Sequence, residues 1–76
     1  MKDNNPNTYF PGDRVILLHM ADDPYPVPDG TRGTVTHVDD ASQIHVRWDN
    51  GSGLAVIPGV DKFRHLTSKE ISEERN

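Results

Sequence analysis

Clusters of turn-forming residues divide the chain into segments of strand length. Between residues 9 and 66 every acidic residue is Asp, and these Asp residues stand beside Gly, Pro, Asn and Ser at 12–13, 22–30, 39–42, 49–53 and 58–61. Such residues favour tight turns because they accept unusual backbone angles or hydrogen-bond their own backbone. The chain has eleven Val and Ile against four Leu and three Ala, and β-branched side chains favour a pleated strand. The sequence therefore predicts an all-β domain.

Size and composition restrict the chain to one small domain. Its 76 residues are too few for two hydrophobic cores, and the absence of Cys excludes both disulfides and thiolate zinc sites. Residues 9–66 hold all the aromatic residues and 14 of the 15 Val, Ile and Leu side chains. We expect a domain over 9–66, a disordered N-terminal arm over 1–8 and a flexible acidic C-terminal tail over 67–76. Within that tail, Thr67 and Glu70 have the spacing of a capping box.

Five strands are expected between the turns. Strict pairing around the Asn50 and Gly51 turn would point Leu54 and Val56 away from the core, so we expect a bulge at Gly51 or Gly53. The predicted strands cover residues 13–19, 31–38, 43–49, 53–57 and 63–66.

The second and third predicted strands can be aligned across the turn that connects them. With residues 39–42 as the loop, antiparallel counting places Val35 opposite Val46, Thr36 opposite His45, and His37 opposite Ile44. Alternate residues of a strand face opposite sides of a sheet. This alignment therefore predicts that Trp48 is buried and that His37 and His45 point to opposite faces.

The order of these elements resembles an SH3-like barrel. The segments Pro11-Gly-Asp-Arg-Val15, Gly30-Thr-Arg-Gly-Thr-Val35 and Val46-Arg-Trp-Asp-Asn-Gly51 resemble the pattern of small bacterial SH3-like and KOW-type barrels. They are most similar to a short family of domains of unknown function that recurs on bacterial phages, plasmids and conjugative elements. The resemblance covers residues 9–66 and implies a single small five-stranded SH3-like barrel, with a 3₁₀ turn at residues 57–62 before the last strand.

The Pro-rich connection after the first strand is the most distinctive segment. Pro at positions 24, 26 and 28 alternates with Tyr25 and Val27, which makes the segment stiff. In one interpretation, Tyr25 and Val27 cover the open end of the barrel. In the other, Asp22, Asp23, Tyr25 and Val27 form a partner-binding ridge, the composition with which SH3 domains hold Pro-rich peptides.

The net charge argues against sequence-independent binding to nucleic acid. The chain carries a formal charge of -4 and has a pI of about 5.3, the wrong sign for a protein that binds phosphate backbones. The resemblance to KOW modules nevertheless implies an alternative, a nucleic-acid or ribosome-associated role for Arg32, Arg47 and Arg64. A contiguous basic stripe would favour that alternative, and scattered arginines would favour a protein partner.

Catalytic and metal-binding patterns are missing from the sequence. The four His residues have no spacing that brings two imidazoles together on one strand. Ser42 and Ser52 lie in predicted turns, where a hydroxyl commonly hydrogen-bonds the backbone. We therefore expect no enzymatic activity, no cofactor and no metal.

These observations together predict a non-enzymatic interaction module. We expect it to bind another protein in a bacterial or phage setting, with nucleic acid as the alternative partner. The sequence contains no apolar run long enough to span a membrane and begins without the apolar run of a secretory signal. A cytoplasmic location is therefore expected, without a membrane partner.

Overall fold

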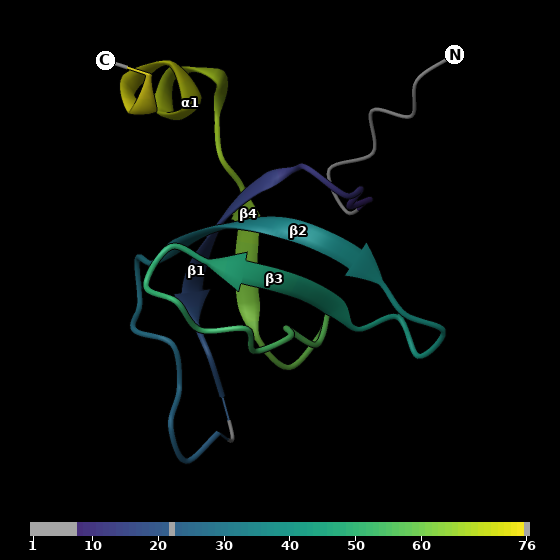
Figure 1. Cartoon of the computed structure of the whole chain (residues 1–76). Helices are drawn as coiled ribbons and strands as arrows, with labels where there is room; N and C mark the ends of the chain where they lie inside the picture. Colours follow the sequence, from purple (N-terminus) through teal and green to yellow (C-terminus); the bar gives the residue numbers. More distant parts are fainter. Residues whose placement is uncertain (1–7, 22, 76) are drawn as a thin grey trace.

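The protein folds into one antiparallel sheet and a short helix. The computed structural model describes residues 8–21 and 23–75. The elements in chain order are β1 (Arg14–His19), β2 (Arg32–Val38), β3 (Ile44–Trp48), β4 (Lys62–His65) and α1 (Ser68–Glu74). The sheet has the order β3-β2-β1-β4, and its two halves cross at a steep angle (Figure 1). The prediction of a mostly β domain is confirmed, with one helix added.

The expected fifth strand over residues 53–57 is reduced to a single bridge. Ile44 and Val56 exchange two backbone hydrogen bonds of 2.9 Å, and the rest of the segment makes no ladder. Gly53 and Pro58 flank the bridge, and neither residue type supports a continuous ladder. Val56 is nevertheless fully buried, so this segment still closes one side of the core.

The register between β2 and β3 differs from the prediction beyond Val35. Val35 pairs with Val46 as predicted, but a bulge at Thr36 places His37 opposite His45. Their rings stack with centroids 4.2 Å apart, so the prediction that they point to opposite faces is wrong.

A loop one residue longer than predicted explains the shift. The loop covers residues 39–43, and the Asp39 side chain shapes it by accepting hydrogen bonds from the backbone N–H groups of Ala41 and Gln43, both at 2.9 Å. The bulge at Thr36 absorbs the extra residue and restores the pairing of Val35. The register shift thus lies in β2, whereas the sequence placed a bulge at Gly51 or Gly53.

The core lies on the inner face of the bent sheet and centres on Trp48. The Trp48 side chain is 1% exposed, as predicted, and its Nε1 donates a 2.8 Å hydrogen bond to the carbonyl oxygen of Leu54. Gly33 pairs with Trp48 on the neighbouring strand, where the missing side chain leaves room for the indole. The buried side chains around Trp48 are Val15, Leu17, Met20, Val27, Val35, Ile44, Val46 and Val56.

Residues 57–61 form a tight turn in place of the expected 3₁₀ turn. The N–H groups of Val60 and Asp61 both donate to the carbonyl oxygen of Ile57, at 3.0 and 2.9 Å. Gly59 has a φ of 88°, which is outside the right-handed region that a 3₁₀ turn requires.

The C-terminal segment contains a capped helix where the sequence predicted a flexible tail. Glu70 N–H donates to the Thr67 hydroxyl at 3.1 Å, and the Glu70 carboxylate accepts from Thr67 N–H at 2.8 Å. The predicted capping box is therefore confirmed. α1 also forms ion pairs with the sheet, which the sequence could not show. Of the expected N-terminal arm, residues 1–7 lie outside the described residues.

The close approach at Gly33 makes it sensitive to a single added methyl group. A Cβ atom there would lie 2.6 Å from Val46 Cγ1 and 2.9 Å from Trp48 Cε3, whereas one at Gly53 would meet nothing within 4 Å. We expect Gly33→Ala to lower the free energy of unfolding by about 1–3 kcal/mol, and Gly53→Ala to leave it within about 0.5 kcal/mol. Urea denaturation of both variants measures this, and equal stabilities would contradict the packing described for Trp48.

Candidate functional site

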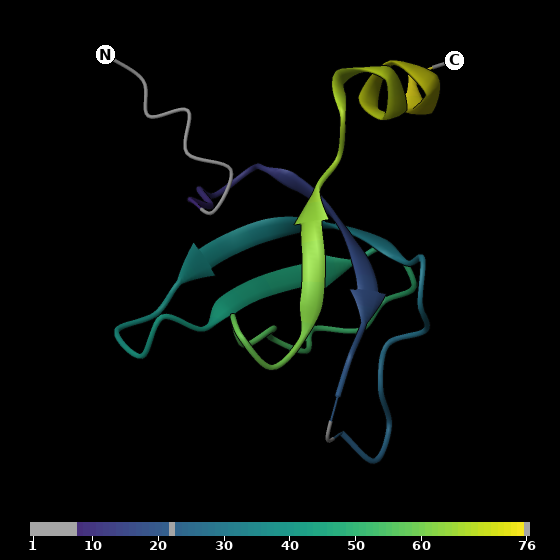
Figure 2. The same ribbon diagram turned by 180° about the vertical axis from the view of Figure 1, so that it is seen from behind.

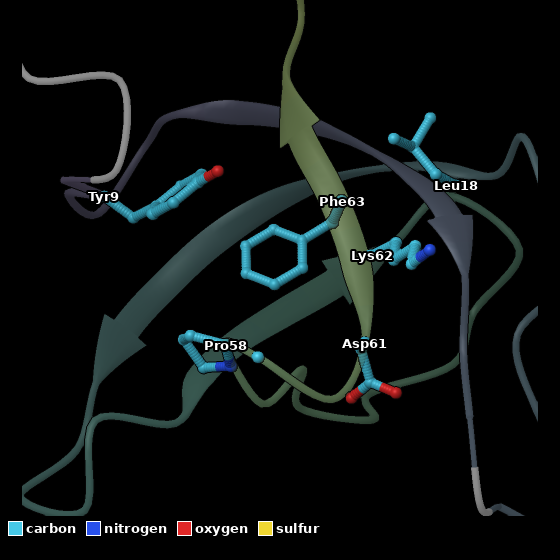
Figure 3. A pocket seen from close by; sticks show the side chains of 7 residues that line it. Tyr9, Leu18, Pro58, Asp61, Lys62 and Phe63 are labelled. Carbon is cyan, nitrogen blue, oxygen red and sulfur yellow. The ribbon is translucent and has the colours of Figure 1, made fainter.

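An apolar hollow crosses β4 on the outside of the domain. It has a volume of about 370 Å³, and Tyr9, Leu18, Pro58 and Phe63 supply its apolar walls. Figure 3 shows the rings of Tyr9, Phe63 and Pro58 on one side of β4, and Leu18 and Lys62 on the other. The four apolar residues come from the segment before β1, from β1, from the 57–61 turn and from β4. Their meeting therefore depends on the pairing of β1 with β4.

A second hollow of about 300 Å³ continues from the first. It shares Tyr9 and Pro58 with the first hollow and adds Val38 and Ile44 at the loop end of the β2–β3 hairpin. We call the two hollows together the Tyr9–Pro58 groove. Its surroundings are apolar, because Val38, Leu18, Ile57 and Val60 are each at least 40% exposed.

Ring contacts with Phe63 and His65 hold Tyr9 in place. Its ring stacks on His65 at a centroid distance of 4.1 Å and tilts against Phe63 at 5.2 Å. Asp13 accepts hydrogen bonds from Phe10 N–H at 2.9 Å and lies 3.2 Å from His65 Nε2. Burial, and then the negative charge of Asp13, raise the pKa of the Tyr9 hydroxyl. The aromatic wall of the groove is therefore preformed, which lowers the entropy lost on binding.

Asp61 stabilises the floor of the groove and is not a free acid. Its side chain is buried, with Oδ1 accepting from Ala21 N–H at 2.8 Å and Oδ2 accepting from Ile57 N–H at 2.9 Å. The carboxylate thereby ties the loop after β1 to the turn before β4. Lys62 supplies the available charge at the groove, since it has no ion-pair partner among residues 8–21 and 23–75.

The Pro-rich loop does not bring its four predicted residues together on one surface. Val27 is 3% exposed and packs in the core, so it covers the domain interior. Tyr25 is 86% exposed, and its backbone N–H donates to the Asp23 carboxylate at 2.9 Å. Asp22 lies outside the described residues. The loop and α1 lie at opposite ends of the molecule (Figure 2).

All five basic residues of the strands share the outer face of the sheet. Paired residues of antiparallel strands, and residues two apart on one strand, point to the same side. Arg14 pairs with Thr34 and Thr34 with Arg47, while Ile16 pairs with both Arg32 and Arg64. Lys62 lies two residues before Arg64 on β4. The structure therefore brings together the predicted Arg32, Arg47 and Arg64 and adds Arg14 and Lys62; we call these five residues the basic face.

Carboxylates of α1 contact three of these arginines. Glu74 accepts from Arg14 Nη2 at 2.6 Å and from Arg32 Nη1 at 3.3 Å. Glu70 receives two hydrogen bonds from Arg64, at 2.8 and 3.1 Å. Arg47 and Lys62 have no carboxylate partner in the part of the chain that the structure describes.

The ion pairs shift the pKa values of the groups that form them. The hydrogen bond from Arg64, followed by that from the Thr67 backbone, lowers the pKa of Glu70 from 4.5 to about 2. The Arg14 guanidinium lowers the pKa of Glu74, and the two carboxylates around Arg14 raise its own pKa. A carboxyl group whose pKa is lower in the folded than in the unfolded state stabilises the folded state at pH values above its unfolded-state pKa. The contribution of Glu70 is thus present above pH 4.5 and lost as the pH falls toward 2.

Asp49, in the turn after β3, contributes a further contact to the basic face. Asp49 binds Arg14 through both oxygens, at 2.9 and 2.7 Å. The hydrogen bond from Arg14 lowers the pKa of Asp49.

The histidines give no metal site within the described residues. His45 Nε2 lies 2.8 Å from Asp39 Oδ2, a contact that lowers the pKa of Asp39. No group of three His, Asp or Glu side chains in residues 8–21 and 23–75 is arranged to hold a metal ion. The single described helix is also too short and too polar to cross a membrane.

Comparison with known proteins identifies a family. The model of the family described as "Domain of unknown function (DUF4314)" matches residues 5–66. The match contains the sheet and the Tyr9–Pro58 groove and ends before α1. Neither the curated proteins nor the solved structures contain a significant match to the chain.

The two hydrogen bonds to Asp61 predict that this side chain supports the loop and the groove. Asp61→Ala leaves two backbone N–H groups without their acceptor, so we expect it to lower the free energy of unfolding by about 2–4 kcal/mol. Asp40→Ala is the matched control, because Asp40 is exposed and its loss should cost less than about 0.5 kcal/mol. Thermal and urea unfolding measure both variants. An Asp61→Ala variant as stable as the control would show that these hydrogen bonds do not hold the loop.

Proposed function

The chain belongs to this family of domains of unknown function, and we propose that it is a small, non-enzymatic protein-interaction module of bacterial or phage origin. We propose that an extended peptide segment of the partner binds in the Tyr9–Pro58 groove. The observation that carries this proposal is the groove itself, which is preformed and apolar and crosses the edge strand of the sheet. An apolar concave site with a few polar groups at its rim is the usual form of a binding site.

We propose that the fold that supports this groove is an SH3-like barrel. The strand order β3-β2-β1-β4, extended by the bridge between Ile44 and Val56, gives five segments in the order expected for such a barrel. The bend of the sheet (Figure 1) and the cluster of buried side chains on its inner face agree with this arrangement. In this interpretation residues 53–57 take the place of the fifth strand.

Exposed apolar side chains support binding at the groove. Leu18 and Val60 are each 45% exposed and Ile57 is 40% exposed. Scattered apolar residues are ordinary on a protein surface, but a patch around a hollow is typical of an interaction site. Tyr25, by comparison, stands on the loop without a ring contact to another aromatic residue of the described chain.

The position of β4 supports an extended partner. β4 is the end strand of the sheet, so it pairs with β1 along one edge only. An extended peptide can add main-chain hydrogen bonds to such an edge and place alternate side chains in pockets beside it. Tyr9, Phe63 and Pro58 lie on the side of β4 away from Leu18 of β1 (Figure 3).

Charge at the rim indicates the chemistry of the partner segment. Lys62 is exposed beside the apolar walls, while the Asp61 oxygens are both engaged by backbone N–H groups. We therefore propose that the partner presents an apolar side chain next to a carboxylate. The apolar group fills the hollow, and the carboxylate pairs with Lys62.

Selection from a random peptide library tests the proposal. We expect the full chain to enrich peptides in which an apolar residue adjoins Asp or Glu. For a selected peptide, Leu18→Ser and Lys62→Glu should each weaken binding by about tenfold or more. Tyr25→Ser is the control on the other surface and should leave the affinity within about twofold.

Two results would contradict this assignment. Failure to enrich any peptide that binds the folded chain in solution would show that the groove is not a peptide-binding site. Loss of binding with Tyr25→Ser but not with Leu18→Ser would move the site to the Pro-rich loop. Circular dichroism of each variant verifies that the sheet is folded.

A further inference from the structure

The sheet has a basic outer face although the chain is acidic. Arg14, Arg32, Arg47, Lys62 and Arg64 all project from this face, as the strand register shows. Most of the Asp residues of the domain lie instead in the turns and loops. The formal net charge of -4 is therefore the sum over the whole chain and does not describe the outer face of the sheet.

The helix that contacts this face lies outside the residues that the family model matches. The family match ends at residue 66, and α1 begins at Ser68. Glu70 and Glu74 of α1 contact Arg14, Arg32 and Arg64. The basic face thus lies within the residues that the family model matches, whereas Glu70 and Glu74 follow them in the chain.

The attachment of α1 is mainly electrostatic. α1 has no buried residue, so it adds little apolar contact to the sheet. Ion pairs between exposed groups contribute weakly and are screened by salt. The helix can therefore leave the basic face without disrupting the core.

We propose that the basic face binds nucleic acid and that α1 covers it, with Glu70 and Glu74 in the places that phosphates take. Arginine binds carboxylates and phosphates by the same paired N–H donors, and Arg64 already binds Glu70 through two such bonds. This surface is separate from the Tyr9–Pro58 groove, apart from Lys62 at their shared border. The proposal therefore goes beyond the peptide-binding function.

The width of the basic face favours a polymer over a single small anion. Its cations come from all four strands, and three inter-strand spacings of about 4.8 Å give a path of roughly 14 Å along the bent sheet. That distance is wider than a single phosphate group, so the face can contact more than one phosphate of a nucleic-acid strand. Arg47 and Lys62, which have no carboxylate partner in the described chain, remain available at the two ends of the row.

Neutralising Glu70 and Glu74 tests whether α1 covers the basic face. Glu70→Gln with Glu74→Gln keeps the capping box, because Gln also serves at its third position, but weakens the ion pairs with the arginines. Asp40→Asn with Glu73→Gln makes the same change of net charge at two exposed residues that contact no arginine in the described chain. The probe is a fluorescent oligo-dT of about twenty nucleotides, a length that exceeds the roughly 14 Å row.

The expected affinities distinguish release of the basic face by α1 from a general effect of net charge. The full wild-type chain should bind the probe no more tightly than roughly 10⁻⁴ M at physiological salt, the weak end of non-specific binding. The Glu70→Gln, Glu74→Gln variant should bind at least tenfold more tightly. Its log affinity should fall with log salt with a slope of about -2, as for three phosphates of a single strand. The control variant should stay within about twofold of wild type.

A second pair of substitutions places the binding on the sheet. Adding Arg32→Ala and Arg47→Ala to the Glu70→Gln, Glu74→Gln variant should return the affinity to the wild-type level. Pro58→Ser, in the groove wall on the other side of β4 from Lys62, should leave it unchanged in the same background, so failure of the groove and failure of the basic face are distinguishable. Trp48 fluorescence verifies folding in each case.

Three results would overturn the proposal. The first is an unchanged affinity in the Glu70→Gln, Glu74→Gln variant, and the second is an equal gain in the charge-matched control. The third is equally tight binding of poly-glutamate of similar length, which would make the basic face a site for acidic proteins.

Discussion

Burial of Trp48 against Gly33 determines both faces of the sheet. The indole fills the space that Gly33 leaves on β2 and donates to the Leu54 carbonyl oxygen at 2.8 Å, which fixes β3 and the following segment around one side chain. Because side chains alternate along a strand, this inner face dictates which residues point outward. The register that buries Val35 and Val46 therefore also gathers Arg14, Arg32, Arg47 and Arg64 on the other side. The core and the basic face are two consequences of one alignment.

Contacts between residues that are far apart in the sequence then form the Tyr9–Pro58 groove and cover the basic face. The groove exists because β1 pairs with β4, which brings Tyr9 to Phe63 across most of the chain. The basic face is covered because Glu74 reaches Arg14, a residue 60 positions earlier. Both contacts join segments that are remote in sequence, and both depend on the same bent sheet. One small domain can in this way present an apolar site and a charged site without overlap, apart from their common Lys62.

Local patterns in the sequence predicted the strands well and the long-range contacts poorly. Turn clusters and β-branched residues located β1 to β4 within about two residues, and alternation placed Trp48 in the core. The bulge at Thr36 escaped prediction because it follows from how the Asp39 side chain bonds two backbone groups in the loop. The sequence indicates Arg32, Arg47 and Arg64 as candidates, but only the observed register shows that they lie on one face. The sequence does not predict the groove, because no local pattern around Tyr9 or Phe63 indicates that the two side chains meet.

α1 rests on the basic face through its ion pairs, and backbone order parameters of α1 at low and high salt test this attachment most directly. Raising the salt from about 0.01 M to about 1 M shortens the screening length from roughly 30 Å to roughly 3 Å. We predict that ¹⁵N relaxation gives α1 amides order parameters near 0.85 at low salt and below about 0.6 at high salt, while those of β1 stay near 0.85. Order parameters of α1 that do not change with salt would contradict the account.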